Sequence, residues 1–190
     1  MNAAVTSLNA VDLLMAVVIA AILVAGWRGQ VISEFIKLLG IFCATFIALH
    51  YYIHFANFLK FQFFGKDAST EFPAFAVLAV LFCAVFVVIS YGWVLILKLK
   101  LPPKIDRYGG SALALVRSYF TCGLIFFMLI LAQHPTITPM AKTSVSCAIF
   151  RHVAENFYRA AYAALIENFF PGEKMNAEAL AVTAKRKNEK

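Results

Sequence analysis

The chain has 190 residues, of which 62% are hydrophobic and only 14% are charged, and its formal net charge at pH 7 is +7. A mean hydropathy of +0.79 fits a chain whose solvent is lipid. The basic residues stand at the ends of apolar runs and in the C-terminal region. They form no basic face with interleaved aromatic residues, which excludes a nucleic-acid-binding protein.

Four apolar runs are each long enough to cross a bilayer, because a hydrocarbon core about 30 Å thick needs about 20 apolar residues of helix. We therefore predict an all-α integral membrane protein. Its transmembrane domain occupies residues 1–132, with four spans at about 11–27, 31–55, 72–97 and 111–132. The spans leave no room for a second soluble domain of ordinary size.

The distribution of Lys and Arg predicts the orientation, because cytoplasmic loops carry the excess of these residues. The loops after spans one and three, at 28–37 and 98–110, hold six basic residues, whereas the loop after span two holds two. We expect the first two loops to be cytoplasmic and both termini to lie on the other side. The C-terminal region opposes this orientation with eight basic residues, but only Lys142 and Arg151 lie near span four.

Small residues spaced four apart mark one face of several spans, and such faces allow membrane helices to approach closely. We expect spans one, two and four to pack together and span three, rich in Val, Phe and Leu, to face more lipid. Stripes of this kind also arise by chance in Ala-rich and Gly-rich spans. The stripes are Ala21, Ala25 and Gly29; Gly40, Ala44 and Ala48; and Gly110, Ala114, Ser118 and Cys122.

Arg117 is the charged residue inside span four, where a charge at the bilayer centre costs about 2.5–3.5 kcal/mol on insertion scales. Three interpretations stay open: the side chain reaches back to the interface, it forms an ion pair with Glu34, or it lines a substrate or ion path. Asp12, at the start of span one, is expected on the opposite side from Arg117. There a negative charge suits the positive end of the helix dipole.

The remaining polar residues predict no catalytic or metal centre. His50 and His54 share one face of span two, but zinc needs three or four ligands, so we assign them with Tyr51, Tyr52 and Phe55 to an aromatic interfacial belt. The four cysteines contain no Cys-x-x-Cys pair, and no hydrolase, protease or phosphate-binding motif occurs. We expect no enzyme and no cofactor.

The C-terminal region after Pro135 and Pro139 predicts one further amphipathic helix over 144–170. Glu155 and Arg159 stand at the favourable i, i+4 spacing within it. Its mixture of charged and aromatic residues suits a helix that lies on the membrane or on a second subunit. Residues 173–190 are charged and lack aromatic residues, which predicts a flexible tail.

Three stretches together are similar to the colicin V production protein (CvpA) family of bacterial inner-membrane proteins. They are Asn-Ala-Val-Asp at 9–12, Gly-Trp-Arg-Gly at 26–29, and Asp-Arg-Tyr-Gly-Gly at 106–110 leading to Arg117. The likeness covers about residues 9–132. Ala114 and Ser118 stand where the family often has Gly, and Ile32-Ser33 replace a common Arg-Glu pair, with Glu34 one position later. The resemblance marks Asp12, Gly26, Arg28, Gly29, Glu34, Asp106, Arg107, Gly110 and Arg117 as its motif residues.

The resemblance implies a non-enzymatic multi-pass inner-membrane protein that supports colicin V toxin production or export, or a general envelope role. The alternative function is a small oligomeric channel or transporter with Arg117 lining the path. The expected partners are the lipid bilayer, a second copy of the chain, and envelope or secretion proteins. No nucleic acid is among them.

Overall fold

The computed structural model describes residues 9–61, 70–97, 102–166 and 175–176, and these residues are all-helical apart from short connections. Four long helices dominate: α1 (Ala10–Arg28), α2 (Val31–Leu59), α3 (Glu71–Leu97) and α4 (Pro103–Leu131). Each is long and apolar enough to cross a membrane. The predicted fold class, a membrane protein with four spanning helices and further helix at the C-terminal end, is confirmed. The predicted tail over 173–190 lies outside the described residues, apart from 175 and 176.

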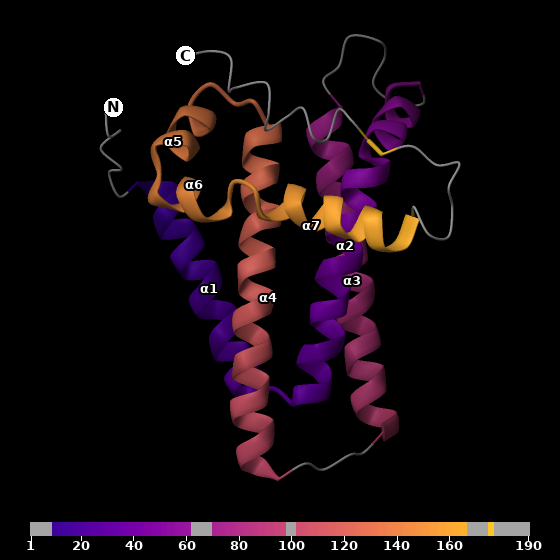
Figure 1. The fold of residues 1–190 in the computed structure, drawn as a ribbon, viewed down its shortest axis with the longest axis vertical. Coiled ribbons are helices and arrows are strands. Elements are labelled where there is room, and N and C mark those ends of the chain that lie inside the picture. Colours follow the sequence, from indigo (N-terminus) through magenta and orange to yellow (C-terminus); the bar gives the residue numbers. More distant parts are fainter. Residues whose placement is uncertain (1–8, 62–69, 98–101, 167–174, 177–190) are drawn as a thin grey trace.

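The four helices are arranged in the spatial order α1–α4–α2–α3 (Figure 1). The central pair buries 44% of the most apolar stretch of each helix, whereas α1 and α3 bury 17%. The expectation that span three faces more lipid than spans two and four is confirmed, because the apolar stretch of α3 is less buried than theirs. The expectation that spans one, two and four all pack together is wrong for one pair of helices. Among the described residues α1 packs on α4 and makes little contact with α2, and α3 lies along α2 over much of its length.

The small residues of α2 explain how α3 packs along this helix. A Cβ at Gly40 would overlap the Cβ of Phe86 on α3. The missing side chain at position 40 thus creates room for a large side chain of the neighbouring helix. A stripe of small residues can accept bulky residues as well as a second small stripe, and here it accepts Phe86.

Backbone contact between α1 and α4 occurs at their glycines. A Cβ at Gly26 would overlap the Cβ of Ala114, and a Cβ at Gly110 would lie 2.8 Å from the carbonyl oxygen of Gly26. Further along, the thiol of Cys122 lies 4.0 Å from the carbonyl oxygen of Met15. The two helices therefore approach closely along one face, as small-residue interfaces in membranes do.

Three short helices and a π-helical turn follow α4. They are α5 (Ile137–Thr143), α6 (Val145–Phe150), α7 (Val153–Ala161) and η2 (Tyr162–Ile166). The region expected as one helix over 144–170 is thus divided, and 167–170 lie outside the described residues. Ser144 starts α6 by accepting a hydrogen bond from the Cys147 amide at 3.1 Å. A turn at residues 151–152 then ends α6 and redirects the chain.

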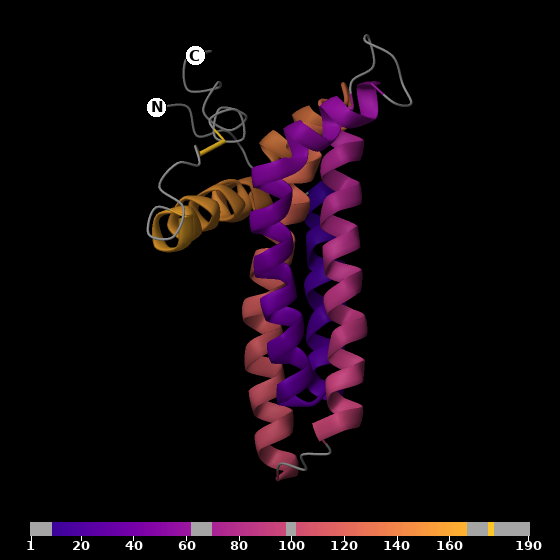
Figure 2. The same ribbon diagram turned by 90° about the vertical axis from the view of Figure 1, so that its right-hand side faces the viewer.

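Helix α7 runs across the long helices and packs on α4 and α2 (Figures 1 and 2). Val153 contacts α4 at Gly123, where a Cβ would lie 2.7 Å from the valine. The buried hydroxyl of Tyr158 lies 2.8 Å from Nδ1 of His50 on α2. His50 is buried beneath α7, and Tyr52 is buried against Phe75 of α3. The assignment of these two residues to an interfacial belt is therefore wrong.

The α1–α4 contact predicts a specific rescue. Gly26→Ala should lower the free energy of unfolding by about 1–3 kcal/mol, the usual cost of overpacking a close interface. Adding Ala114→Gly removes the overlapping methyl group and should recover most of this loss. Thermal unfolding of the purified protein in detergent measures both effects.

Gly92→Ala is the matched control, because a Cβ at Gly92 meets no atom within 4 Å. It should leave stability unchanged or slightly raised. If Gly26→Ala behaves like Gly92→Ala, the close approach of α1 and α4 does not exist.

Candidate functional site

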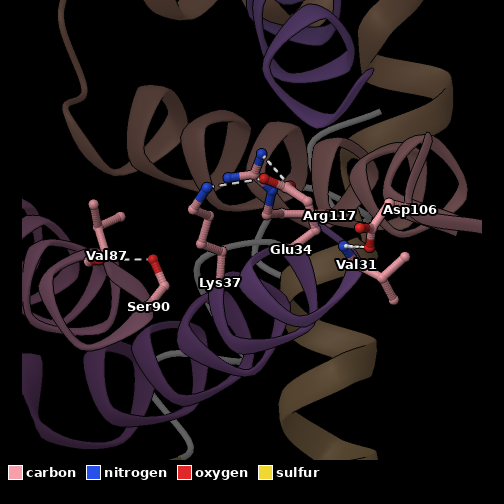
Figure 3. Close-up of polar contacts among 7 residues, drawn as sticks. All are labelled: Val31, Glu34, Lys37, Val87, Ser90, Asp106 and Arg117. Carbon is pink, nitrogen blue, oxygen red and sulfur yellow. Dashed lines mark hydrogen bonds and ion pairs between the residues drawn. The ribbon is translucent and has the colours of Figure 1, made fainter. Parts of the chain in front are cut away.

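The central feature of the site is the buried carboxylate of Glu34, in the first turn of α2. One oxygen lies 2.7 Å from a terminal nitrogen of Arg117 on α4, and the other lies 2.9 Å from Nζ of Lys37 (Figure 3). The Glu34 side chain is 0% exposed, and those of Arg117 and Lys37 are 14% and 15% exposed. Among the three interpretations of Arg117, the structure shows the ion pair with Glu34.

The surroundings of this ion pair explain why it forms. A charge within a membrane domain is costly unless it meets an opposite charge or water, and Arg117 lies far inside α4. Glu34, Arg117 and Lys37 together carry a net charge of +1. Nε of Arg117 is buried and makes no hydrogen bond with any part of the chain that the structure describes. Other polar residues of the spans, such as Thr45 and Ser118, bond to carbonyls of their own helix.

The short connection between α1 and α2 makes room for Glu34. Gly29 ends α1, and a Cβ at this position would lie 3.1 Å from an oxygen of the Glu34 carboxylate. The carboxylate also benefits from its position in the first turn of a helix, where the dipole favours negative charge. The role of Gly29 is therefore to leave space for the Glu34 carboxylate. The spacing of the glycines in the sequence does not predict this contact.

The first turn of α4 holds the start of α2. Oδ1 of Asp106 accepts a hydrogen bond from the amide of Val31 at 3.2 Å. The N-cap residue of α2, Gln30, makes no capping hydrogen bond with its own side chain. Asp106 thus caps a helix 75 residues away in sequence, and it does so beside the charged cluster (Figure 3).

Aromatic and cationic contacts join the same two segments. The guanidinium carbon of Arg107 lies 4.5 Å from the centre of the Trp27 ring. Tyr108 meets that ring edge-on at a centroid distance of 6.2 Å. The 26–29 and 106–110 stretches, which are far apart in sequence, therefore lie against one another at the end of the bundle where α1 ends and α4 begins.

Asp12 lies at the other end of α1 and holds the C-terminal helices. Its carboxylate accepts hydrogen bonds from the Ser146 amide at 2.7 Å, the Ser146 hydroxyl at 2.6 Å and the Val145 amide at 3.3 Å. It therefore caps the first turn of α6. Asn9 adds a hydrogen bond from its side-chain amide to the carbonyl of Met140 at 2.8 Å. Asp12 is apart from Arg117, as expected, but its partner Ser146 was not predicted.

The arrangement assigns most of the motif residues to contacts between helices. Gly26 and Gly110 bring α1 and α4 together, Glu34 and Arg117 join α2 to α4, and Asp106 caps α2. Arg28 differs, because its side chain is exposed. Within the described ranges, no group of three or more His, Cys, Asp or Glu side chains could hold a metal ion.

Comparison with known proteins identifies one family. The model of the Colicin V production protein family matches residues 11–155, which is most of the chain and includes α1 to α7 as far as Glu155. No curated protein and no solved structure matches the chain.

The Glu34–Arg117 contact predicts strong coupling in a double-mutant cycle. Arg117→Gln or Glu34→Gln alone should lower the free energy of unfolding by about 3–5 kcal/mol, because each leaves a buried charge with altered pairing. The double variant should be less destabilised than the sum of the two, by about 1–3 kcal/mol. Reversible unfolding in mixed micelles measures all four proteins, and additive losses would show that the two charges do not interact.

Removing Asp12 should release α5 and α6 from α1. Asp12→Ala deletes the acceptor of three hydrogen bonds from α6 and of one from the Asn9 amide, and such bonds to a charged group each contribute about 1.5–3 kcal/mol. Hydrogen–deuterium exchange should therefore accelerate over residues 137–150. Asp12→Asn keeps one acceptor oxygen and should show a smaller acceleration. Unchanged exchange in Asp12→Ala would contradict the capping role.

Proposed function

The chain belongs to the Colicin V production protein family, and from that premise we propose that it is a non-catalytic inner-membrane protein that supports production or export of a colicin V-type toxin. The family match over residues 11–155 is the observation that carries this proposal. In cells that make no such toxin, the proposed function is a broader role in the cell envelope.

The contacts of the polar residues support a structural rather than a catalytic use of the motif. The charged groups of Glu34, Arg117 and Asp106 all make contacts that join α2 to α4. A catalytic acid, base or nucleophile must instead face a substrate-sized space with a partner that tunes its reactivity. The same contacts weigh against the channel alternative, since a guanidinium that pairs with a fully buried carboxylate is directed toward the bundle interior.

The proposed orientation follows from charge and connectivity. Helix α1 begins and α4 ends at one end of the bundle, and α2 begins and α3 ends at the other (Figure 1). The second end carries Arg28, Lys37, Lys104 and Arg107. Because basic loops are retained in the cytoplasm, we assign this end to the cytoplasm. Helices α5 to α7 then lie on the periplasmic side.

Complementation of a colicin V-producing strain that lacks its own member of this family tests the proposal. Toxin inside cells, secreted toxin and the amount of this protein in the membrane are measured together. The wild-type chain should restore secreted toxin. Normal membrane insertion without any restoration would overturn the toxin role and leave only family membership.

Arg117→Gln distinguishes a structural role of the charge from a path-lining one. If Arg117 holds α2 against α4, toxin output and membrane level should fall together. If output is lost while the membrane level stays normal, Arg117 acts directly and the channel alternative gains support. Lys142→Gln is the control, because it removes one exposed positive charge on α5 and should change neither quantity.

A further inference from the structure

An open pocket of about 570 Å³ lies at the end of the bundle where α1 meets α2. It is lined by residues 27–30 and by Lys104, Asp106, Arg107 and Tyr108 of α4. Its volume is within the range of about 300–1,000 Å³ typical of small-molecule sites. The contacts of Asp106 with Val31 and of Arg107 with Trp27 hold the segments that line this pocket.

The charges of the pocket favour an anion. Arg28, Lys104 and Arg107 contribute three positive charges, and Asp106 contributes one negative charge. The Asp106 carboxylate is engaged by the Val31 amide, which partly offsets its charge. The side chains of Arg28 and Lys104 are exposed, and within the described part of the chain no ion pair is formed by either. The pocket therefore presents an excess of cationic donors to solvent or lipid.

One of these cations is held in place before any ligand arrives. The Arg107 guanidinium lies over the Trp27 ring, and the Tyr108 ring supports Trp27 from the side. An arginine that stacks on an aromatic face keeps its planar fork of N–H donors available for an oxyanion. This preorganisation reduces the conformational entropy lost on binding.

The depth of the pocket points to the source of the anion. Helix α1 ends at Arg28, and the long apolar part of α4 begins only after Gly110. Trp27 and Tyr108 are 45% and 67% exposed. Exposed Trp and Tyr at the ends of spanning helices lie at the level of lipid headgroups. The cationic donors are therefore at the depth where phosphodiester groups are concentrated.

We propose that this pocket binds the phosphate group of an anionic phospholipid headgroup. Arg107, stacked on Trp27, offers two parallel N–H donors to the phosphate oxygens, as arginine does with phosphate elsewhere. Arg28 and Lys104 add positive charge on either side. Zwitterionic lipids carry the same phosphate, but their terminal ammonium group meets the cations of the pocket and weakens binding. A soluble phosphate compound has the same oxyanion without the acyl chains.

Binding to purified full-length protein tests the proposal. Delipidated protein in detergent is titrated with phosphatidylglycerol, phosphatidylcholine or inorganic phosphate, and bound lipid is counted by native mass spectrometry. Phosphatidylglycerol should bind saturably and more tightly than phosphatidylcholine. Each basic residue near a membrane surface contributes a factor of about five to the attraction, so R28Q/K104Q should weaken phosphatidylglycerol binding about 25-fold.

The double variant K60Q/K142Q is the matched control, because it removes two positive charges elsewhere on the chain. It should bind phosphatidylglycerol like the wild type, and thermal unfolding should show that both double variants are folded. Equal binding of phosphatidylglycerol by the two double variants would overturn the proposal that this pocket is the binding site. Inorganic phosphate that displaces phosphatidylglycerol at equal concentration would overturn the lipid as the source of the phosphate.

Discussion

The fold depends on a carboxylate that has no contact with solvent, that of Glu34. Two cations, Arg117 from the opposite helix and Lys37 from the next turn of its own, compensate its charge. In a low-dielectric environment neither Glu34 nor Arg117 is tolerated alone, so each of the two central helices requires the other at a fixed height and rotation. Lys37 also lies 5.8 Å from the ring of Tyr91, which extends the same charged cluster to α3.

Other contacts around this pair are arranged so that it can form. Gly29 leaves space for the Glu34 carboxylate, and Asp106 fixes the start of α2 next to it. Gly26 and Gly110 let α1 approach α4 from the other side. At the far end, Asp12 holds α6, and α7 covers α2 through Tyr158 and His50. The bundle is thus joined by polar contacts at both ends, and the close backbone packing of α1 on α4 begins at the end that holds Glu34.

The apolar runs predict the four spanning helices because length and composition alone decide whether a segment crosses a membrane. The candidate site was partly predictable: Glu34 and Arg117 are oppositely charged residues inside or beside spans on one side of the membrane, which made them possible partners. The C-terminal contacts were not predictable. Nothing in the spacing of Ser146 or Tyr158 shows that α6 and α7 fold back onto α1 and α2, since these are tertiary contacts of more than 100 residues in sequence separation. The contact of α3 with α2 was not predicted, because a stripe of small residues does not reveal whether a small or a large side chain will occupy it.

Arg117 pairs with Glu34 inside the membrane domain and does not reach back to the interface. Magic-angle-spinning NMR of the protein in lipid bilayers can measure the distance between the labelled Glu34 carboxylate carbon and the Arg117 guanidinium nitrogens. We expect a dipolar coupling that corresponds to ion-pair contact, with an N–O separation below about 4 Å. A guanidinium that shows no coupling to Glu34, but couples to lipid phosphorus or exchanges protons with water, would contradict it.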